Sequence, residues 1–577
     1  MLFDDILKSL GEFGKYQSFV FFLASMPGVF NGLQNLNIVF ILAIPNFRCA
    51  IPGFLNDTYA TQGDKHAELI NFTIPAEDNC HIYVNRTEDN FNQTAACDGW
   101  VYDKSVFVST AVTDFNLVCQ RSILRSITAM MFYPGMLFGG LIGGHLADRF
   151  GRKLIIFTMG IGLVVIGFSL AFSPNVYALM AFRFVSAFFG MAFYAGAFVL
   201  GMEIIGPNKR MIAGILMGAF FTIGYVLITP FAYIFRNWRH MQIGLSVPSL
   251  FLVFYWWLLP ESPRWQFIVG REDEAEQTLR RAAEVNKVTL PEKLFDSRTV
   301  EKKPTDSFIS MLRYKVLFCR MAIICFNWGA VSMVYYGLAL NSGRLVGDIF
   351  VNFLVSGLVE FPAMAFAIFT LNPFGRKKVH AFCMCLAGTS CIASIFVMLF
   401  ADPELSWILV VLSSIGKFGV SAAFSIVYVY TAELNPTVVR TAAIGLGSVA
   451  ARIFTLAAPY IVDLGDLVGG DFASVLPLVV FGIVSVTAGL LALLLPETRR
   501  RRLPETIEDA LHFTSRPTNR TADVPEVNLG FSGADDQADD NSHVTNRRPK
   551  TESVRAEINL ALRPEEDDVA CQMNTSL

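Results

Sequence analysis

The chain has 577 residues and a formal net charge of −3 at pH 7; 53% of its residues are hydrophobic and 16% are charged. This composition is too apolar for an ordinary soluble protein, and the chain is too long for a single core. Its basic residues lie at the ends of apolar stretches and form no patch, so the charge pattern indicates no nucleic-acid partner. We therefore predict an all-α polytopic membrane protein.

The chain begins with a short acidic segment, residues 1–15, followed by an apolar stretch at 16–44. The segment lacks the basic region and the small-residue cleavage site of a signal peptide. We therefore expect the stretch 16–44 to be both the first membrane span and the insertion signal. Asn31 and Asn35 fall at its mid-depth, where a polar side chain must find a partner.

Residues 45–123 are polar and contain four cysteines and four N-x-S/T sequons. An even number of cysteines in one polar loop indicates two disulfides in an oxidising compartment, with three pairings open. The loop is therefore expected outside the cell, with the sequons as glycosylation acceptors. The cysteines are Cys49, Cys80, Cys97 and Cys119, and the sequons begin at Asn56, Asn71, Asn85 and Asn92.

Further apolar stretches of helical length follow, five within 124–259 and six within 318–495, which makes twelve predicted spans in two groups of six. A charged stretch at 260–317 separates the groups, and its segment 271–287 has the pattern of an amphipathic helix or of a linker. Lys and Arg gather on one side of the alternating spans, which predicts that this side and both termini are cytoplasmic. The exceptions are Arg236, Arg239 and Arg344.

The two groups of spans repeat the same motifs in the same order. FGRK occurs at 150–153 and again at 374–377, and PES at 260–262 is echoed by PET at 496–498. Ordered repetition indicates a duplicated six-span unit, as in transporters whose halves rock around a midplane site. Charged residues near the repeats would then bridge the halves when the cytoplasmic side closes; the alternative is that they only orient and cap helices. These residues are Asp148, Arg149, Arg152, Glu203, Arg210, Arg376, Glu433 and Arg440.

One acidic residue, Glu360, lies near the centre of a membrane span, the apolar stretch 347–371. A charge at that depth costs roughly 3 kcal/mol unless it faces a cavity or a partner. We therefore treat Glu360 as a functional-site candidate; the alternatives are a protonated carboxyl or a pair with Lys or Arg that joins two helices.

Enzyme motifs are absent from the sequence. Gly416-Lys417 is followed by Phe418 and not by the Ser or Thr of a phosphate loop, and no HExxH or CxxC occurs. We expect no enzyme activity, no metal and no cofactor.

Several segments carry a family resemblance: GHLADRFGRK at 144–153, PESPRW at 260–265, VEFPA at 359–363 and GKFGVSAAFSIVYVYTAELNPTVVR at 416–440, together with the large cysteine-containing loop. With them the chain resembles the organic cation, organic anion and carnitine transporter family of the major facilitator superfamily. The resemblance implies a 6+6 pseudo-repeat major facilitator fold that works by alternating access in the plasma membrane.

Within this family the intramembrane charges divide the substrates, and Glu360 together with Arg452 resembles the carnitine and zwitterion branch. The chemistry agrees. A quaternary ammonium is best held by a carboxylate and aromatic faces, and a substrate carboxylate suits the fork of Arg. Tyr194, Tyr335 and Tyr336 could supply rings, the alternative being packed or lipid-facing tyrosines. We expect Glu360 and Arg452 to face one aqueous chamber.

The resemblance also suggests that Asn31 lies near the substrate or near a coupling sodium ion. Phe193 stands immediately before Tyr194, where the carnitine members have Asn, which leaves sodium coupling and carnitine itself open. Lys417, also within a span, is either the standing partner of Glu360 or a coupling element. For Arg183 we expect a structural role.

Two alternatives remain at this point: an organic anion or sugar carrier of the same fold, or a non-transporting receptor or scaffold. Residues 496–577 form a polar tail that we expect to be cytoplasmic and largely disordered. It ends in Thr575-Ser576-Leu577, and a Thr two residues before a terminal aliphatic residue fits the ligand pattern of a PDZ domain.

Overall fold

The computed structural model describes residues 3–513 except 55, 76–77, 85–93, 292–293, 296–307, 346, 401, 403–404, 406, 469–475, 500, 502 and 512. The predictions on Asn85, Asn92, Thr575 and Leu577 lie outside the described residues. Within this range the chain folds as one compact helical unit.

Ten helical segments of the described chain are long and apolar enough to cross a membrane. The helix α2 (Lys15–Asn35) carries several buried polar side chains, and α23 (Leu476–Ala492) is shorter, but both lie among the other spans. Each of the twelve predicted spans therefore contains helix among the described residues, and the predicted all-α class is confirmed.

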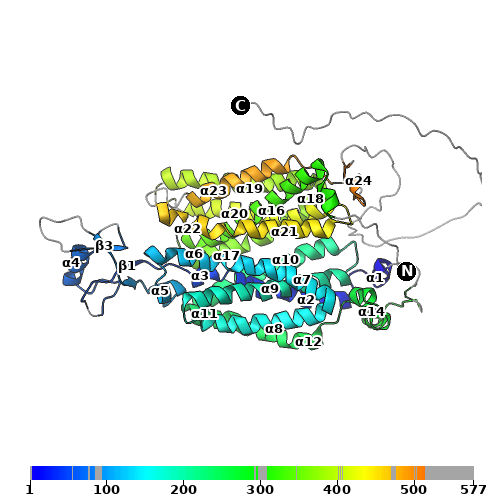
Figure 1. The fold of residues 1–577 in the computed structure, drawn as a ribbon, viewed down its shortest axis with the longest axis horizontal. Helices are drawn as coiled ribbons and strands as arrows, with labels where there is room; N and C mark the ends of the chain where they lie inside the picture. The colour runs from blue at the N-terminus through cyan, green and yellow to red at the C-terminus, as the bar shows by residue number, and fades with distance from the viewer. Residues whose placement is uncertain are drawn as a thin grey trace, which may run out of the picture. The chain divides into compact units, whose positions relative to one another are not determined.

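The helices form two groups that follow the two halves of the sequence, as Figure 1 shows by colour. The first group contains α2, α3 (Ile38–Ile41), α6 (Ser122–Met130), α7 (Phe132–Phe150), α8 (Arg152–Ala171), α9 (Val176–Ile204), α10 (Arg210–Ile234), α11 (Trp238–Ser246), the 3-10 helix η2 (Val247–Phe254) and α12 (Tyr255–Leu258). The second contains α16 (Lys315–Asn341), the 3-10 helix η3 (Ser342–Arg344), α17 (Ile349–Leu358), α18 (Glu360–Phe374), α19 (Arg376–Phe400), α20 (Trp407–Leu434), α21 (Arg440–Thr455), α22 (Ala458–Val468) and α23.

Small residues let α7 and α9 approach closely. A Cβ atom at Gly135 or Gly139 would collide with the backbone of Phe184 or Phe188 in α9. Membrane helices commonly pack through such residues, because lipid provides no hydrophobic force to drive them together.

The first span, predicted as one stretch over 16–44, is broken after Asn35. The buried guanidinium of Arg183 in α9 donates to the carbonyl of Gln34 at 2.8 Å and to Asn37 Oδ1 at 2.9 Å, and it lies 4.4 Å from the ring centroid of Phe132. A buried cation needs acceptors, and the end of α2 leaves carbonyl groups free to provide them. The break between α2 and α3 and the burial of Arg183 therefore support each other.

Strands and short helices build a small domain at one end of the bundle, which we call the disulfide end (Figure 1). Its elements are β1 (Phe47–Cys49) paired antiparallel with β4 (Trp100–Tyr102), β2 (His81–Tyr83) paired antiparallel with β3 (Thr94–Ala96), α4 (Asp64–Thr73), α5 (Ala111–Phe115) and the 3-10 helix η1 (Cys119–Arg121).

The four cysteines of this domain form two disulfides, Cys49–Cys97 and Cys80–Cys119, which selects one of the three open pairings. A second stabilising feature is the buried carboxylate of Asp57, which lies 2.5 Å from Arg48 Nη2 and 3.0 Å from His66 Nε2. The sequon residues Asn56 and Asn71 are exposed.

Short helices gather at the opposite end of the bundle, which we call the α14 end (Figure 1): α1 (Phe3–Ser9), α13 (Pro263–Ile268), α14 (Glu272–Asn286), α15 (Phe308–Leu312) and α24 (Ile507–Leu511). Ile6, Leu7 and Leu10 pack against Leu279 and Ala283 of α14. The segment 271–287 is therefore mostly helical, and its apolar face holds the N-terminal segment to the bundle.

Candidate functional site

Glu360 lies at mid-bundle, at the first residue of α18, and is 1% exposed. Its Oε1 atom is 3.1 Å from Lys417 Nζ of α20, and its Oε2 atom accepts a hydrogen bond of 2.7 Å from Thr222 of α10. The standing partner of Glu360 is therefore Lys417 and not Arg452. Because Thr222 belongs to the first half and Glu360 to the second, the carboxylate also connects the two halves.

The ammonium of Lys417 is surrounded by aromatic faces. It lies 3.3 Å from the ring centroid of Tyr335 and 5.4 Å from that of Tyr225, and it donates to the carbonyl oxygen of Tyr335 at 3.3 Å. A carboxylate with aromatic faces is the environment that favours an organic cation. The side chain of Lys417 therefore occupies a cation-binding environment.

Arg452 lies at mid-length of the eleventh span and is 5% exposed. Among the described residues its Nη1 atom has no hydrogen-bond partner, and Nη2 contacts the weak acceptor Met191 Sδ at 3.9 Å. Tyr428 of α20 is close enough to interact with the guanidinium. Within the described residues no carboxylate pairs with Arg452, so this buried cation can accept an anionic group from a ligand.

The other predicted site residues lie around these two charges. Tyr336 accepts a hydrogen bond of 3.2 Å from Asn35 of α2, which joins the halves, and its ring lies 5.1 Å from that of Tyr335. Tyr194 is half-buried and lies within electrostatic range of Arg452. Asn31 is 4% exposed, and its side chain faces Gly190 in α9.

Two residues near Arg452, Gly445 and Tyr428, have exposed surface. Gly445 precedes Arg452 by two helical turns on the same face, and a Cβ placed there would meet nothing within 4 Å. Tyr428, which packs 4.3 Å from the ring of Trp328, is nevertheless 37% exposed.

The expectation that Glu360 and Arg452 face one aqueous chamber stays a prediction. Arg452 is 5% exposed, whereas Glu360 is 1% exposed and is covered by Lys417 and Tyr335. The physical reason is charge neutralisation: a buried carboxylate without water needs a cation in direct contact, and the chain supplies that cation itself.

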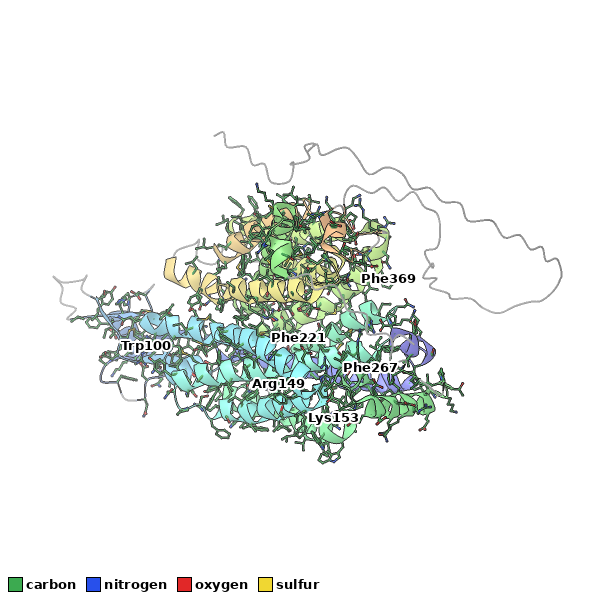
Figure 2. The ribbon with its side chains drawn as sticks, turned by 45° about the vertical axis from the view of Figure 1, so that its right-hand side comes forward. Trp100, Arg149, Lys153, Phe221, Phe267 and Phe369 are labelled. Carbon is green, nitrogen blue, oxygen red and sulfur yellow. A yellow bond between two sulfur atoms is a disulfide. The ribbon has the colours of Figure 1, made fainter. Side chains whose placement is uncertain are left out.

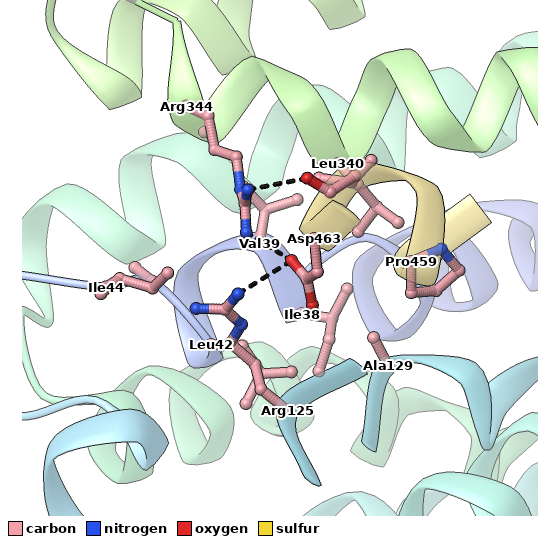
Figure 3. Close-up of a pocket in the computed structure, with 13 residues that line it drawn as sticks. Ile38, Val39, Leu42, Ile44, Arg125, Ala129, Leu340, Arg344, Pro459 and Asp463 are labelled. Carbon is pink, nitrogen blue, oxygen red and sulfur yellow. Dashed lines mark hydrogen bonds and ion pairs between the residues drawn. The ribbon is translucent and has the colours of Figure 1, made fainter. Parts of the chain in front are cut away.

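The disulfide end is closed by an ionic cluster that joins the halves. Asp463 of α22 lies 2.9 Å from Arg125 Nη2 of α6 and contacts Arg344 (Figure 3). It also accepts a hydrogen bond from Ser126. Arg125, Arg344 and Asp463 line a cavity of about 90 Å³ between the halves. Sequence reasoning missed Arg125 and Asp463. The sequence did contain one signal. Arg344 lies on the side opposite to most Lys and Arg residues, and in the structure it pairs with Asp463.

An aromatic layer lies in the same region. The ring of Phe40 in α3 packs 5.6 Å from Phe350 and 4.8 Å from Phe353 of α17. The contacts between the two halves at the disulfide end are therefore both ionic and aromatic.

The predicted gating charges at the α14 end pair within each half. Arg152 lies 3.1 Å from Glu203 and 2.9 Å from Asp148. In the other half Arg376 lies 2.9 Å from Glu433. The equivalence of these two clusters agrees with the sequence repeat.

The remaining gating candidates make other contacts. Arg210 binds Asp4 at 2.8 Å, and Arg149, labelled in Figure 2, is exposed and lies 5.4 Å from the ring of Phe150. The Nε and Nη2 atoms of Arg440 have no hydrogen-bond partner. Among the described residues, no ion pair at this end joins the two halves, so the predicted bridging is not formed in this conformation.

The repeated PES and PET motifs have a function that sequence reasoning also missed. Glu261 accepts hydrogen bonds from the backbone N–H groups of Arg152 at 2.8 Å and Lys153 at 3.2 Å, and Glu497 does the same for Arg376 and Lys377 at 2.9 and 3.2 Å. Each acid thus caps the N-terminus of α8 or α19, where unpaired N–H groups favour a negative charge. Burial raises the pKa of Glu261, and these backbone hydrogen bonds oppose the shift.

Two six-helix halves around buried mid-bundle charges define a membrane transporter of the major facilitator class, and not an enzyme. The family model described as "Sugar (and other) transporter" matches residues 70–509. The chain is 36% identical to "Organic cation transporter protein" of Drosophila melanogaster over 90% of this chain and 96% of the relative. It is 34% identical to "Organic cation/carnitine transporter 2" of Homo sapiens, with the same shares covered. The chain therefore belongs to the organic cation and carnitine transporter family within the sugar and other transporters, as predicted.

Solved structures of the Escherichia coli xylose transporter XylE share the fold. The partially occluded inward-open form gives a TM-score of 0.58 at 14% identity and covers 85% of this chain and 100% of that one. The proton:xylose symporter bound to 6-bromo-6-deoxy-D-glucose gives 0.56 at 15% identity, covering 85% and 98%. These likenesses confirm the predicted major facilitator fold.

Proposed function

We propose that this protein transports small organic cations and zwitterions, with carnitine-like betaines first, by alternating access in the plasma membrane. The disulfide end would be extracellular, and both termini would be cytoplasmic. The names of its relatives, which include organic cation and carnitine transporters, support this substrate class.

The observation that carries the proposal is the unpaired guanidinium of Arg452, 5% exposed and beside Tyr428 and Tyr194. In a carrier of simple cations, a buried arginine at the site would repel the substrate and would not strengthen its binding. A zwitterion supplies the missing carboxylate to Arg452 and presents its ammonium to Glu360 and the aromatic rings.

The inter-half contacts support alternating access. The Asp463 cluster and the Phe40 layer join the halves at the disulfide end, while no ion pair among the described residues joins them at the α14 end. The reverse state would separate Asp463 from Arg125 and bring the two charged clusters at the α14 end together. Bridging by the gating charges remains a prediction for that state.

The test is uptake into vesicles that contain the purified protein, with labelled glycine betaine and labelled tetraethylammonium as probes. In Arg452→Gln we expect betaine uptake to require at least tenfold more substrate for half-saturation, since a charge-assisted pair is worth about 1.5–3 kcal/mol. Tetraethylammonium uptake should change less than threefold. Arg236→Gln, which removes an exposed arginine at the disulfide end, is the matched control.

Two results would contradict the proposal. Uptake of dicarboxylates that survives Glu360→Gln but is lost in Arg452→Ala would indicate an anion carrier. Absence of saturable uptake of any probe would indicate a receptor or scaffold.

The same vesicles test the sodium prediction, because coupled uptake must increase when a sodium gradient is imposed. Phe193 is fully buried and packs against Tyr255, so it offers no polar atom to such an ion. Glycosylation at Asn56, Asn71, Asn85 and Asn92 and PDZ binding through Thr575 and Leu577 also remain predictions. A shift in gel mobility after glycosidase treatment tests the glycosylation. A pull-down with a PDZ domain, carried out with and without Leu577, tests the PDZ binding.

A further inference from the structure

The carboxylate of Asp463 at the disulfide end is held by donors from both halves. Arg125 Nη2 of α6 lies 2.9 Å away, the hydroxyl of the neighbouring Ser126 donates a hydrogen bond, and Arg344 of η3 contacts the same carboxylate. Figure 3 shows the guanidinium groups of Arg125 and Arg344 directed at it. Guanidinium groups form the strongest charge-assisted hydrogen bonds to carboxylates. The cluster is therefore a carboxylate-binding site whose occupant belongs to the chain.

Opening of the disulfide end would divide this site unequally. Arg344 and Asp463 both belong to the second half, and Arg344 Nη1 also donates to the carbonyl of Val462 at 2.7 Å, so we expect these residues to move together. Arg125 and Ser126 are consecutive residues of α6 in the first half. Separation of the halves would therefore take the donors of α6 away from Asp463.

The cavity at this cluster gives a ligand room beside Arg125. Its volume is about 90 Å³, and its lining combines Arg125, Arg344 and Asp463 with apolar residues such as Val39 and Leu340. A water molecule needs roughly 10–15 Å³ of such a volume, so several waters fit while the halves are in contact. Space for a small carboxylate therefore exists already, and separation of the halves enlarges it.

We propose, resting on the proposed function, that Arg125 and Ser126 form an entry subsite for the carboxylate of a zwitterionic substrate. Asp463 occupies this subsite while the disulfide end is closed, and the carboxylate of a betaine takes its place when the end opens. Arg452 precedes Asp463 by eleven residues in the same span, roughly 15 Å at the rise of an α-helix. The substrate carboxylate then passes from Arg125 to Arg452 as the substrate moves inward.

A purely closing role of the cluster makes a different prediction. If Arg125 and Asp463 only hold the end shut, removal of either partner favours the open state, and the affinity for betaine shifts in the same direction in both variants. If Arg125 also binds the substrate, the two variants shift the affinity in opposite directions. Asp463→Asn removes the competing carboxylate, whereas Arg125→Gln removes the site itself.

Glycine betaine and choline are the probes, because both carry a trimethylammonium group and only betaine has a carboxylate. Uptake is measured in vesicles in which the disulfide end of the full-length protein faces outward. We expect the half-saturating concentration of betaine to rise at least fivefold in Arg125→Gln and to fall at least threefold in Asp463→Asn. Arg125→Gln should leave the value for choline at or below that of the unmodified protein, because choline offers no group for a guanidinium to bind.

A labelling assay separates this subsite from the inner site at Arg452. A membrane-impermeant maleimide labels Val39→Cys, which lines the cavity, in the Asp463→Asn background. Betaine should slow the labelling, also when Arg452→Gln is added, but not when Arg125→Gln is added. Arg121→Gln, which removes an exposed arginine of η1, is the matched control. The charge-balanced double variant Arg125→Gln with Asp463→Asn checks folding by its size-exclusion profile.

Each failure has a different meaning. A half-saturating concentration of betaine that does not rise in Arg125→Gln overturns the entry subsite and leaves the proposed function intact, and so does betaine protection of Val39→Cys that persists in Arg125→Gln. Protection that depends on Arg125, without saturable uptake by the unmodified protein, overturns the proposed function and keeps the subsite as a carboxylate-binding site. Absence of both overturns the proposed function and this inference together.

Discussion

The guanidinium of Arg125 lies 2.9 Å from the carboxylate of Asp463, and this ion pair joins the two halves at the disulfide end. The side chains are 7% and 15% exposed, so water screens the pair little. Arg344 from the second half contacts the same carboxylate. A transporter must break such a contact to open this end, and the strength of the contact therefore helps to set the balance between its two states.

The first prediction concerns this balance. Asp463→Asn removes the charge and retains the shape, and we expect it to favour the state open at the disulfide end by about 2 kcal/mol, or roughly thirtyfold. The measurement is the rate at which a membrane-impermeant maleimide labels Val39→Cys, a position lining the cavity in Figure 3. Asp114→Asn is the control, because Asp114 pairs with Arg239 within one half. Equal labelling rates in both backgrounds would rule out a role of the pair in closure.

The second prediction concerns the N-terminal helix. Burial raises the pKa of Asp4, but Arg210, Arg264 and Lys8 lower it more, so its net pKa is below the ordinary 3.8. A lowered pKa in the folded state means that the carboxylate stabilises docking above pH 3.8 and loses this effect as the pH falls through the lowered value.

Asp4→Asn should therefore loosen α1 at neutral pH. Because Asp4 is partly exposed, the contribution is at most about 1 kcal/mol. Hydrogen exchange of residues 3–15 provides the measurement, with Asp5→Asn, whose partner Lys8 is on the same exposed turn, as control. Slower or unchanged exchange in Asp4→Asn would contradict the docking role.

The third prediction concerns the disulfide pairing. Cys97→Ser should free the thiol of Cys49, and Cys80→Ser should free that of Cys119. Each loss should destabilise the domain by about 2–5 kcal/mol. Peptide mapping without reduction identifies the freed thiol, and Cys391→Ser, a buried free cysteine in α19, is the control. A peptide that links Cys49 to Cys80 would disprove this pairing.

The fourth prediction concerns the break in the first span. Arg183→Lys retains the charge but loses the planar guanidinium whose N–H group donates to both Gln34 and Asn37. We expect a loss of about 2 kcal/mol in the free energy of unfolding, the scale of hydrogen bonds to a charged group. Thermal unfolding in detergent measures it, with Arg236→Lys, which binds the carbonyl of Ser105 at an exposed position, as control. Equal melting temperatures for both variants would show that the Arg183 guanidinium does not contribute to stability.

Some parts of the candidate site were predictable because they depend on local chemistry. Glu360, Arg452 and Lys417 are charges within apolar stretches, and the cost of burying a charge marks such residues in any sequence. Which of the two cations pairs with Glu360 was not predictable. That choice depends on how α18, α20 and α21 are rotated and packed, which no periodicity reports.

The pattern of amino acids by itself determined the apolar spans, the 6+6 repeat and the cysteine-containing loop, because these follow from hydropathy, motif spacing and composition along the chain. The family was indicated by the resemblance of several motifs. Only the tertiary structure decided that Lys417 neutralises Glu360, that no carboxylate of the described residues pairs with Arg452 and that Asp463 joins the halves. Each of these facts concerns side chains from helices far apart in sequence, and the interaction energy of two charges depends on their distance and burial, which exist only once the helices have packed.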